Sequence, residues 1–205
     1  MTSTRSTTTG VAASRPGEPP PSDATLWRLI GDDDHAAFTA LFERHAERVW
    51  NYAYRLTASW STAEDLLSAT FLAAWRKRGD GVLVRESALP WLCTVAANLA
   101  RTEWRAGRRR RRVLARLTSA ADTTVTDHAE DLAARSEARD RLRLVVAAVE
   151  RLPRSEREVA QLCLLGEMPV ADAAALLGIA EASVRSRVSR ARTKLRDLTT
   201  RTHDE

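Results

Sequence analysis

The sequence predicts an all-α protein made of two helical domains joined by a flexible acidic linker, the C-terminal domain containing a helix-turn-helix. Apart from its N-terminus, the 205-residue chain is rich in Ala, Leu and Arg, which favour helices by intrinsic propensity. Runs of β-branched residues with alternating polarity are nearly absent. All six Trp, two Tyr and three Phe lie between Trp27 and Trp104, so the first domain has a bulky core and the second has no aromatic residue.

Composition also sets the domain boundaries. We expect residues 1–22, a Ser/Thr/Gly/Pro tail that holds four of the seven prolines, to be disordered. The first domain is assigned to residues 23–112, the linker to 113–137 and the second domain to 138–200. Apolar periodicity predicts helices at 24–30, 35–57, 63–78 and 89–112 in the first domain, and at 139–151, 155–165, 170–177 and 181–198 in the second.

Charge is unevenly distributed along the chain. The net charge of +5 and the pI of about 10.0 suit a polyanionic partner. Residues 101–116 carry eight arginines and one acid, and residues 181–201 carry seven basic residues and two acids. Between them, residues 117–140 carry six acids and two arginines. Two basic segments separated by an acidic one predict two contacts with nucleic acid.

Several classes of function lack the residues that they require. Cys93 and Cys163 stand alone in apolar surroundings, without CxxC or Cys/His spacing, so we expect two reduced core thiols and no metal site. The histidines are scattered and fit neither a triad nor a metal set: His35, His45, His128 and His203. No carboxylate pair, Gly-rich phosphate loop or activated nucleophile stands out. We therefore expect no enzyme, no cofactor and no small-molecule substrate.

No segment indicates export or a membrane. The N-terminus is rich in Ser and Thr and lacks the apolar stretch of a signal peptide. The longest apolar runs, such as residues 144–149, are too short to span a bilayer. We expect a cytoplasmic protein without membrane insertion.

Two of the predicted helices have recognisable starts. Ser61, with Glu64 three residues later, has the spacing of a capping box, and Ser155 begins a helix of the second domain in a similar way. The helix after Ser61 carries one apolar stripe, formed by Leu67, Phe71, Ala74 and Trp75. Gly79 is expected to end this helix and to open a loop that reaches Ser87.

Residues 169–198 have the pattern of a helix-turn-helix. Gly178 follows a short helix with small apolar residues on one face, at the place where a left-handed conformation ends a helix. In the next helix the apolar residues fall on one side: Val184, Val188, Ala191 and Leu195. The opposite side carries hydroxyl and basic side chains, as a recognition helix requires for base edges and phosphates: Arg185, Ser186, Ser189, Arg190, Thr193 and Arg196. The alternative is an ordinary surface helix with solvated arginines.

The helix predicted at 89–112 ends in five successive arginines, residues 108–112, which is typical of a phosphate-contacting surface. Asn98 lies among apolar neighbours on this helix, where its amide can either hydrogen-bond a base edge or bridge helices. Trp91 and Trp104 could stack on unpaired bases. Their helical spacing favours packing in the core instead.

Three stretches of the chain together resemble the extracytoplasmic-function (ECF) sigma factors of bacterial RNA polymerase. Residues 63–76 (AEDLLSATFLAAWR) resemble the helix of that family that binds the polymerase clamp. Residues 90–101 (PWLCTVAANLAR) resemble the helix that reads the −10 promoter element, and residues 182–192 (ASVRSRVSRAR) resemble the −35 recognition helix. The resemblance covers about 24–112 and 138–199. Ser68 and Ala69 depart from it, because family members often carry Gln and an acid there.

The resemblance implies partners and roles. The partners would be core RNA polymerase and promoter DNA, with an anti-sigma factor as a further candidate. Core-polymerase contacts would come from Glu64, Asp65, Leu66 and Phe71; −10 contacts from Asn98, Arg101, Arg105, Arg108 and Arg109; and −35 contacts from Ser183, Arg185, Ser186, Arg187 and Arg190. The loop 79–87 would receive a flipped −10 base. The acidic linker would occupy the RNA path of the polymerase.

An autonomous helix-turn-helix regulator that binds duplex DNA as a dimer is the main alternative. It accounts for the second domain but leaves the clamp-like helix and the arginine cluster of the first domain without a role. The two interpretations differ in a simple experiment, because the regulator binds specific duplex DNA without polymerase and the sigma factor binds it weakly or not at all alone.

Overall fold

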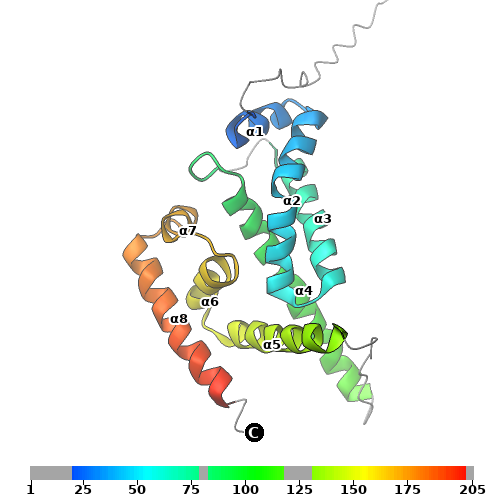
Figure 1. The fold of residues 1–205 in the computed structure, drawn as a ribbon, viewed down its shortest axis with the longest axis vertical. Coiled ribbons are helices and arrows are strands. Elements are labelled where there is room, and N and C mark those ends of the chain that lie inside the picture. The colour runs from blue at the N-terminus through cyan, green and yellow to red at the C-terminus, as the bar shows by residue number, and fades with distance from the viewer. Residues whose placement is uncertain (1–19, 79–82, 118–130, 202–205) are drawn as a thin grey trace, which may run out of the picture.

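The computed structural model describes residues 20–78, 83–117 and 131–201, with side chains left out at 108, 110–117, 131–135 and 199–201. Within these ranges the chain is helical, with one isolated β-bridge between Val84 and Ser87 and no strand (Figure 1). The elements are α1 (Asp23–Gly31), α2 (His35–Thr57), α3 (Trp60–Arg76), α4 (Leu89–Leu117), α5 (Asp131–Arg151), α6 (Arg154–Val159), the π-helix η1 (Ala160–Leu165), α7 (Val170–Leu177) and α8 (Glu181–Arg201). The predicted all-α fold class is confirmed.

The N-terminal domain consists of α1–α4, with α2 packed against the other three helices. Its core gathers α1, the first half of α2 and the ends of α3 and α4 around large buried side chains: Leu26, Trp27, Ile30, Leu41, Phe71 and Leu92. Trp91 packs edge-on against Trp27, with ring centroids 5.3 Å apart, as expected for a core aromatic. Burial of these side chains supplies the main driving force for this domain.

Helix α3 begins earlier than the sequence predicted. Ala58 ends α2 in the left-handed conformation (φ 50°), and this reverses the chain at once. Ser59 is therefore the first extended residue, and its hydroxyl accepts a hydrogen bond from the backbone N–H of Thr62 at 3.4 Å. The predicted capping box at Ser61 and Glu64 is wrong, because both residues lie inside the helix.

A buried carboxylate ties three elements of the N-terminal domain together. Asp23 Oδ1 accepts a hydrogen bond from Arg44 Nη1 at 2.6 Å, and its Oδ2 accepts one from the backbone N–H of Ala88 at 2.9 Å and lies 2.7 Å from His45 Nε2. Burial by itself would raise the pKa of Asp23, but the hydrogen bonds from His45, Ala88 and Arg44 outweigh it and hold the pKa below its ordinary value. Asp23 thus fixes the start of α4 against α1 and α2.

The C-terminal domain consists of α5–α8. Helix α6 begins at Arg154 after Pro153, without a side-chain cap, so the predicted cap at Ser155 is wrong. The helix predicted at 155–165 continues from α6 into η1, whose wider turn is closed by a hydrogen bond from Gly166 N to the Gln161 carbonyl at 2.9 Å. Gly178 ends α7 with φ 63°, as the sequence predicted.

The predicted linker is partly helical. Helix α4 continues to Leu117 and α5 begins at Asp131, so the helices extend into both ends of the segment 113–137. Residues 118–130, with the middle of the predicted linker, lie outside the described residues, as does the predicted tail up to residue 19.

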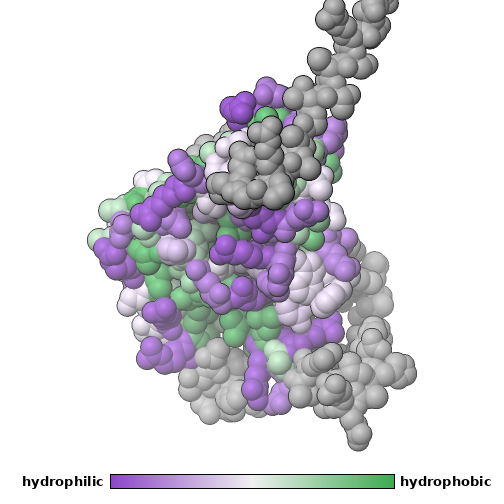
Figure 2. All heavy atoms as spheres, turned by 45° about the horizontal axis from the view of Figure 1, so that its top comes forward, coloured by the Kyte–Doolittle hydropathy of each residue, from purple (hydrophilic) through white to green (hydrophobic). Residues whose placement is uncertain are grey.

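The two domains pack against each other. One cluster of buried apolar residues contains members of α2, α3 and α4 together with members of every helix from α5 to α8. Helix α5 lies across the turn between α2 and α3, η1 and α7 pack against α4, and α8 lies on the far side of α6 and α7 from α4 (Figure 1). Figure 2 shows apolar side chains gathered on one side of the visible face, with hydrophilic residues over much of the rest.

Candidate nucleic-acid interface

Helix α8 has the two faces that its sequence predicted. Val184, Val188 and Ala191 are buried against the rest of the C-terminal domain, and Leu195 is half-buried. The opposite face is exposed along its length and carries Ser183, Arg185, Ser186, Ser189, Arg190, Thr193 and Arg196. A helix held by an apolar back with donors on its front can enter a major groove.

Four of the five residues predicted for the −35 contact lie on this exposed face, and Arg187 differs. Its side chain is half-buried at the flank of the helix. Arg185 Nη1 lies 2.9 Å from Glu181, and Arg190 Nη1 donates to Ser186 Oγ at 2.9 Å. These i,i+4 contacts hold the two arginines along the outer side of α8.

A buried acid sets the angle of α8. Glu156 on α6 accepts hydrogen bonds from Lys194 Nζ at 2.7 and 2.9 Å, and Arg190 Nε lies 3.5 Å away. Glu156 is almost fully buried, whereas both basic side chains remain about half exposed. The pairing therefore fixes two basic residues on the body of the domain. Sequence reasoning missed Glu156, because its position in the first turn of the short helix α6 gave no sign of this role.

Helix α4 also has a buried and an exposed side. Leu92, Ala96 and Ala100 are buried, while the predicted −10 residues are spaced three and four apart on the other side. Asn98, Arg105 and Arg109 are exposed there, and Arg101 is half-buried at the edge. The side chain of Arg108 is outside the described part of the chain. An exposed amide followed by arginines on one stripe can contact a base and the strand that carries it.

The end of the loop before α4 is held in a defined conformation. Arg85 and Glu86 adopt positive φ (49° and 62°) between the bridged residues Val84 and Ser87, and Ala88 donates to Asp23. Residues 79–82 of the predicted base-receiving loop lie outside the described residues. The described half is thus anchored directly to the start of α4.

The residues predicted to contact polymerase divide into two pairs. Glu64 and Asp65 are exposed on α3, whereas Leu66 and Phe71 are each only 3% exposed and belong to the two cores. The exposed stripe of α3 continues on both sides of the acids, at four-residue intervals, with Trp60 (62% exposed), Ser68 and Leu72 (49% exposed). Trp60 Nε1 donates to Glu64 Oε1 at 2.9 Å, so the aromatic ring lies directly beside the acid.

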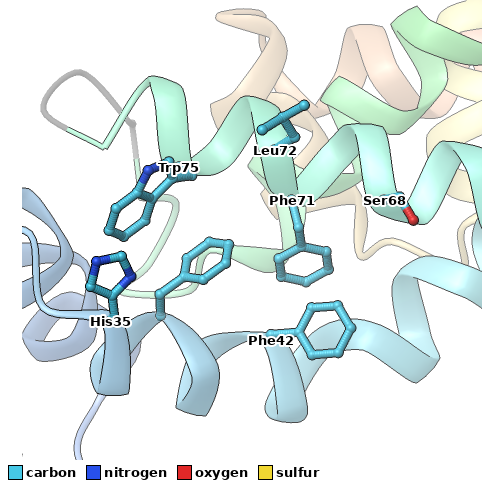
Figure 3. A pocket seen from close by; sticks show the side chains of 7 residues that line it. His35, Phe42, Ser68, Phe71, Leu72 and Trp75 are labelled. Atoms are coloured by element: carbon cyan, nitrogen blue, oxygen red, sulfur yellow. The ribbon is translucent and has the colours of Figure 1, made fainter.

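An open apolar pocket of about 410 Å³ lies beside this stripe, between α2 and α3. It is lined by His35, Phe38, Phe42, Ser68, Phe71, Leu72 and Trp75. In Figure 3 the rings of His35 and Phe42 on α2 face those of Trp75 and Phe71 on α3. Trp60, Leu72 and Phe42 were missed from the sequence, although the spacing of 60, 64, 68 and 72 was available as a signal. Exposed large apolar side chains next to acids are typical of a protein-binding surface.

Cys93 is buried in the core, as predicted, whereas Cys163 is half-buried and packs against it. Burial raises the pKa of Cys93 to about 12 and also raises the pKa of the half-buried Cys163. In the described ranges, no three Cys, His or acidic side chains are arranged to hold a metal ion. No helix among the described residues is long and apolar enough to cross a membrane.

One domain of the described chain carries an exposed acidic and aromatic stripe and a basic helix, and the other carries a helix-turn-helix. This arrangement fits a two-domain promoter-recognition protein. Residues 41–112 match the Sigma-70 region 2 family and residues 142–195 match the Sigma-70 region 4 family. The chain is 33% identical to the RNA polymerase sigma factor CarQ of Myxococcus xanthus, over 82% of this chain and 91% of CarQ. It is 34% identical to the ECF RNA polymerase sigma factor SigL of Mycobacterium tuberculosis, over 75% of this chain and 83% of SigL.

The protein therefore belongs to the ECF sigma factors, the subunits that direct RNA polymerase to promoters and start transcription, and these are non-enzymatic initiation factors. Solved sigma factor structures share the fold. CnrH in complex with the cytosolic domain of CnrY matches with a TM-score of 0.61 and 24% identity, over 88% of this chain and 98% of CnrH. RpoE in complex with the anti-sigma factor NepR from Bartonella quintana matches with a TM-score of 0.50 and 25% identity, over 80% and 96%.

Proposed function

We propose that this sigma factor grips a promoter at two places while α3 holds it on core RNA polymerase. The N-terminal domain binds polymerase and captures an unpaired base of the −10 element, and the C-terminal domain reads the −35 element as duplex. The observation that carries this proposal is the pair of basic helix faces, on α4 and α8, which belong to different domains and are both exposed. We assign residues 23–112 to the domain that binds polymerase and the −10 element, and residues 138–200 to the domain that reads the −35 element.

The −35 contact is proposed for Ser183, Arg185, Ser186, Arg187 and Arg190. Support comes from the exposed front of α8 and from the Glu156 pairing that orients it. Serine hydroxyls can bond either bases or phosphates, and arginines favour guanine edges and phosphates. The half-buried Arg187 fits a phosphate contact at the rim of the groove better than a contact at its floor.

The −10 contact is proposed for Asn98, Arg101, Arg105, Arg108 and Arg109. The side-chain amide of Asn98 has an acceptor oxygen and a donor NH₂ group, which can together hydrogen-bond the exposed edge of an extruded base. The arginines continue the same stripe toward the C-terminal end of α4, where they neutralise phosphates of the opened strand. The loop before α4, anchored by Asp23, forms the side of the base pocket.

The polymerase contact is proposed for Glu64 and Asp65 as direct partners, with Leu66 and Phe71 acting through their packing under the helix. Trp60, Leu72 and the pocket beside α3 extend this surface and supply apolar anchors. Ser68, which stands where relatives often carry Gln, opens on to the pocket. An acidic centre with apolar ends fits a basic amphipathic helix of the polymerase.

Three further expectations belong to this proposal. The chain has no catalytic activity of its own and needs no cofactor. It acts in the cytoplasm, where RNA polymerase transcribes. An anti-sigma factor regulates it, by analogy with the solved complex of RpoE with NepR.

The affinity of the purified protein for core polymerase tests the polymerase contact directly. Glu64→Ala with Asp65→Ala is expected to lower core-polymerase affinity by about tenfold or more, because it removes the charged centre of the interface. Glu47→Ala with Glu43→Ala, which removes two exposed acids from α2, is the matched control and should leave affinity within about twofold. Equal losses in both double variants would show that net charge, and not this surface, governs binding.

A further inference from the structure

Helix α8 begins with an acid, although most of its charged residues are basic. Glu181 is the first residue of the helix, and its side chain is 46% exposed. The other acid of the helix, Asp197, lies about 24 Å further along at 1.5 Å per residue. Between the two acids stand Arg185, Arg187, Arg190, Arg192, Lys194 and Arg196. Phosphates repel a carboxylate, so Glu181 does not serve the backbone contact for which these bases are suited.

Glu181 is paired with Arg185 one turn later. Arg185 Nη1 donates a hydrogen bond to Glu181 Oε2 at 2.9 Å, and the Arg185 side chain is 61% exposed. This hydrogen bond uses one donor of a guanidinium that has five and one of the two oxygens of the carboxylate. The pair therefore presents an acceptor and several donors side by side at the start of the helix.

The residues around the pair are small. Ala180, Ala182 and Ser183 are exposed at the first turn of α8. Short side chains allow this turn to approach the floor of a major groove closely, and the N-terminal residues of a recognition helix are the ones that contact base edges. Glu181 and Arg185 can thus reach bases as well as phosphates.

One base pair offers the complementary groups at a matching distance. In the major groove guanine presents O6 and N7 as acceptors, and cytosine presents its N4 amine as a donor. The O6 and N4 atoms of one G·C pair are about 2.9 Å apart, because they are hydrogen-bonded to each other. Arg185 can donate to both guanine acceptors while Glu181 accepts from the cytosine amine of the same pair. In the reversed orientation the carboxylate would face the guanine acceptors.

We propose that Glu181 is a specificity-determining residue of the −35 contact, which selects one G·C base pair together with Arg185. The inference rests on the proposed −35 contact of α8. Arg185 supplies attraction for guanine, and Glu181 supplies discrimination, because acceptor edges and phosphates repel its charge. The acid thus lowers the affinity for wrong sequences more than the affinity for the right one.

Glu181 has a structural effect as well, which the experiment must separate from base recognition. An acid at the start of a helix favours the macrodipole, and an acid four residues before an arginine stabilises the helix. Both effects are the same for every DNA sequence that the helix meets. A change in base preference at one position is therefore a readout that a purely structural role would not move.

Transcription in vitro from templates with a randomised −35 element measures this preference, with the full-length protein, core polymerase and sequencing of barcoded transcripts. We expect one position at which the wild type prefers G·C to C·G by about tenfold or more. Glu181→Ala should reduce that preference to about twofold and raise initiation from mismatched sequences relative to the best one. Glu181→Gln should increase the use of A·T at the same position, because a carboxamide pairs with adenine.

Asp197→Ala is the matched control, because it removes the same charge from an exposed residue of the same helix. It should leave the preference at every position within about twofold of the wild type. The inference is overturned if Glu181→Ala keeps all wild-type preferences, or if it lowers initiation from every sequence by the same factor. Failure of the proposed function is a different outcome, because the wild type itself would then show no −35 preference or no initiation.

Discussion

Asp23 shows how one buried side chain supports the proposed −10 site without belonging to it. It joins α1, α2 and the start of α4 through Arg44, His45 and the backbone of Ala88. Because these contacts favour its ionised form, the folded pKa lies below the unfolded value of about 3.9. The stabilisation is then fully present above that value and is lost as the pH falls through it toward the folded pKa.

Asp23→Asn is expected to destabilise the protein by about 2–4 kcal/mol at pH 7, because it leaves Arg44 and His45 without their buried partner. Urea denaturation measures the free energy of unfolding. The loss should shrink below pH 4, because the carboxyl of the unfolded wild-type chain becomes protonated there while the folded carboxylate stays ionised, so the wild type loses the stabilisation that the variant lacks. A difference between the two proteins that stays constant from pH 7 to pH 3 would contradict the assigned role.

Asn98 is the residue proposed to contact the flipped base. Asn98→Ala is expected to reduce promoter opening by about tenfold, since it removes a two-point hydrogen bond to a base edge, and to leave core binding within about twofold. Opening is measured by permanganate reactivity of the −10 region and binding by pull-down. Thr102→Ala, which changes an exposed neighbour on the same helix, is the control. If core binding falls as much as opening, Asn98 has no base contact.

At the scale of elements, α8 is oriented by α6. Glu156→Ala should destabilise the C-terminal domain by about 1–2 kcal/mol, because the bases it holds are half exposed and solvent screens part of the pairing. It should also lower −35-dependent transcription more than transcription from a promoter without a −35 element. Glu158→Ala removes a neighbouring acid that pairs with Arg154. It should change neither the stability of the domain nor the transcription from one promoter relative to the other. Equal effects on both promoters would exclude an orienting role.

Sequence reasoning worked best where a local rule decides the outcome. Gly178 and the four-three-four spacing of apolar residues in α8 were sufficient to predict the helix-turn-helix, because a left-handed helix end and an apolar stripe depend on neighbouring residues alone. The caps at Ser61 and Ser155 failed because the preceding residue decided where the chain reversed: the left-handed Ala58 in one case and Pro153 in the other. The spacing of a serine three residues before an acid does not show which preceding residue ends the previous segment.

Only some features of the candidate sites could be predicted from the sequence. The exposed stripes of α4 and α8 follow from helical periodicity, and the resemblance indicated Glu64 and Asp65, which are exposed on α3. Burial of Leu66 and Phe71 depends on which helices cover α3, and the role of Glu156 depends on the crossing of α6 and α8. Both features depend on tertiary packing, so the spacing of residues within one helix does not predict them.

At the scale of the whole molecule, the packing between the two domains could not be predicted from the sequence. Its apolar residues read equally well as parts of separate cores, and residues far apart in the chain, such as Arg55 and Glu167, form its ion pairs.

Glu167 and Asp172 of the C-terminal domain pair with Arg55 and Arg85 of the N-terminal domain. Reversing the charge of these two acids should separate the two domains. Glu167→Arg with Asp172→Arg places like charges beside Arg55 and Arg85, and small-angle scattering should show a radius of gyration several ångströms above that of the wild type. Exchange of one pair, Arg55→Glu with Glu167→Arg, restores attraction and should keep the compact value. An identical radius in all three proteins would show that these charges do not govern the arrangement.

The central claim is that two basic helix faces act on one promoter only when polymerase holds them. Transcription in vitro with purified core polymerase tests it most directly, using a template with −35 and −10 elements and the same template with either element scrambled. We predict initiation that requires the protein, core polymerase and both elements, with little promoter binding by the protein alone. Strong, specific binding to the duplex without polymerase, together with no initiation in its presence, would contradict the account.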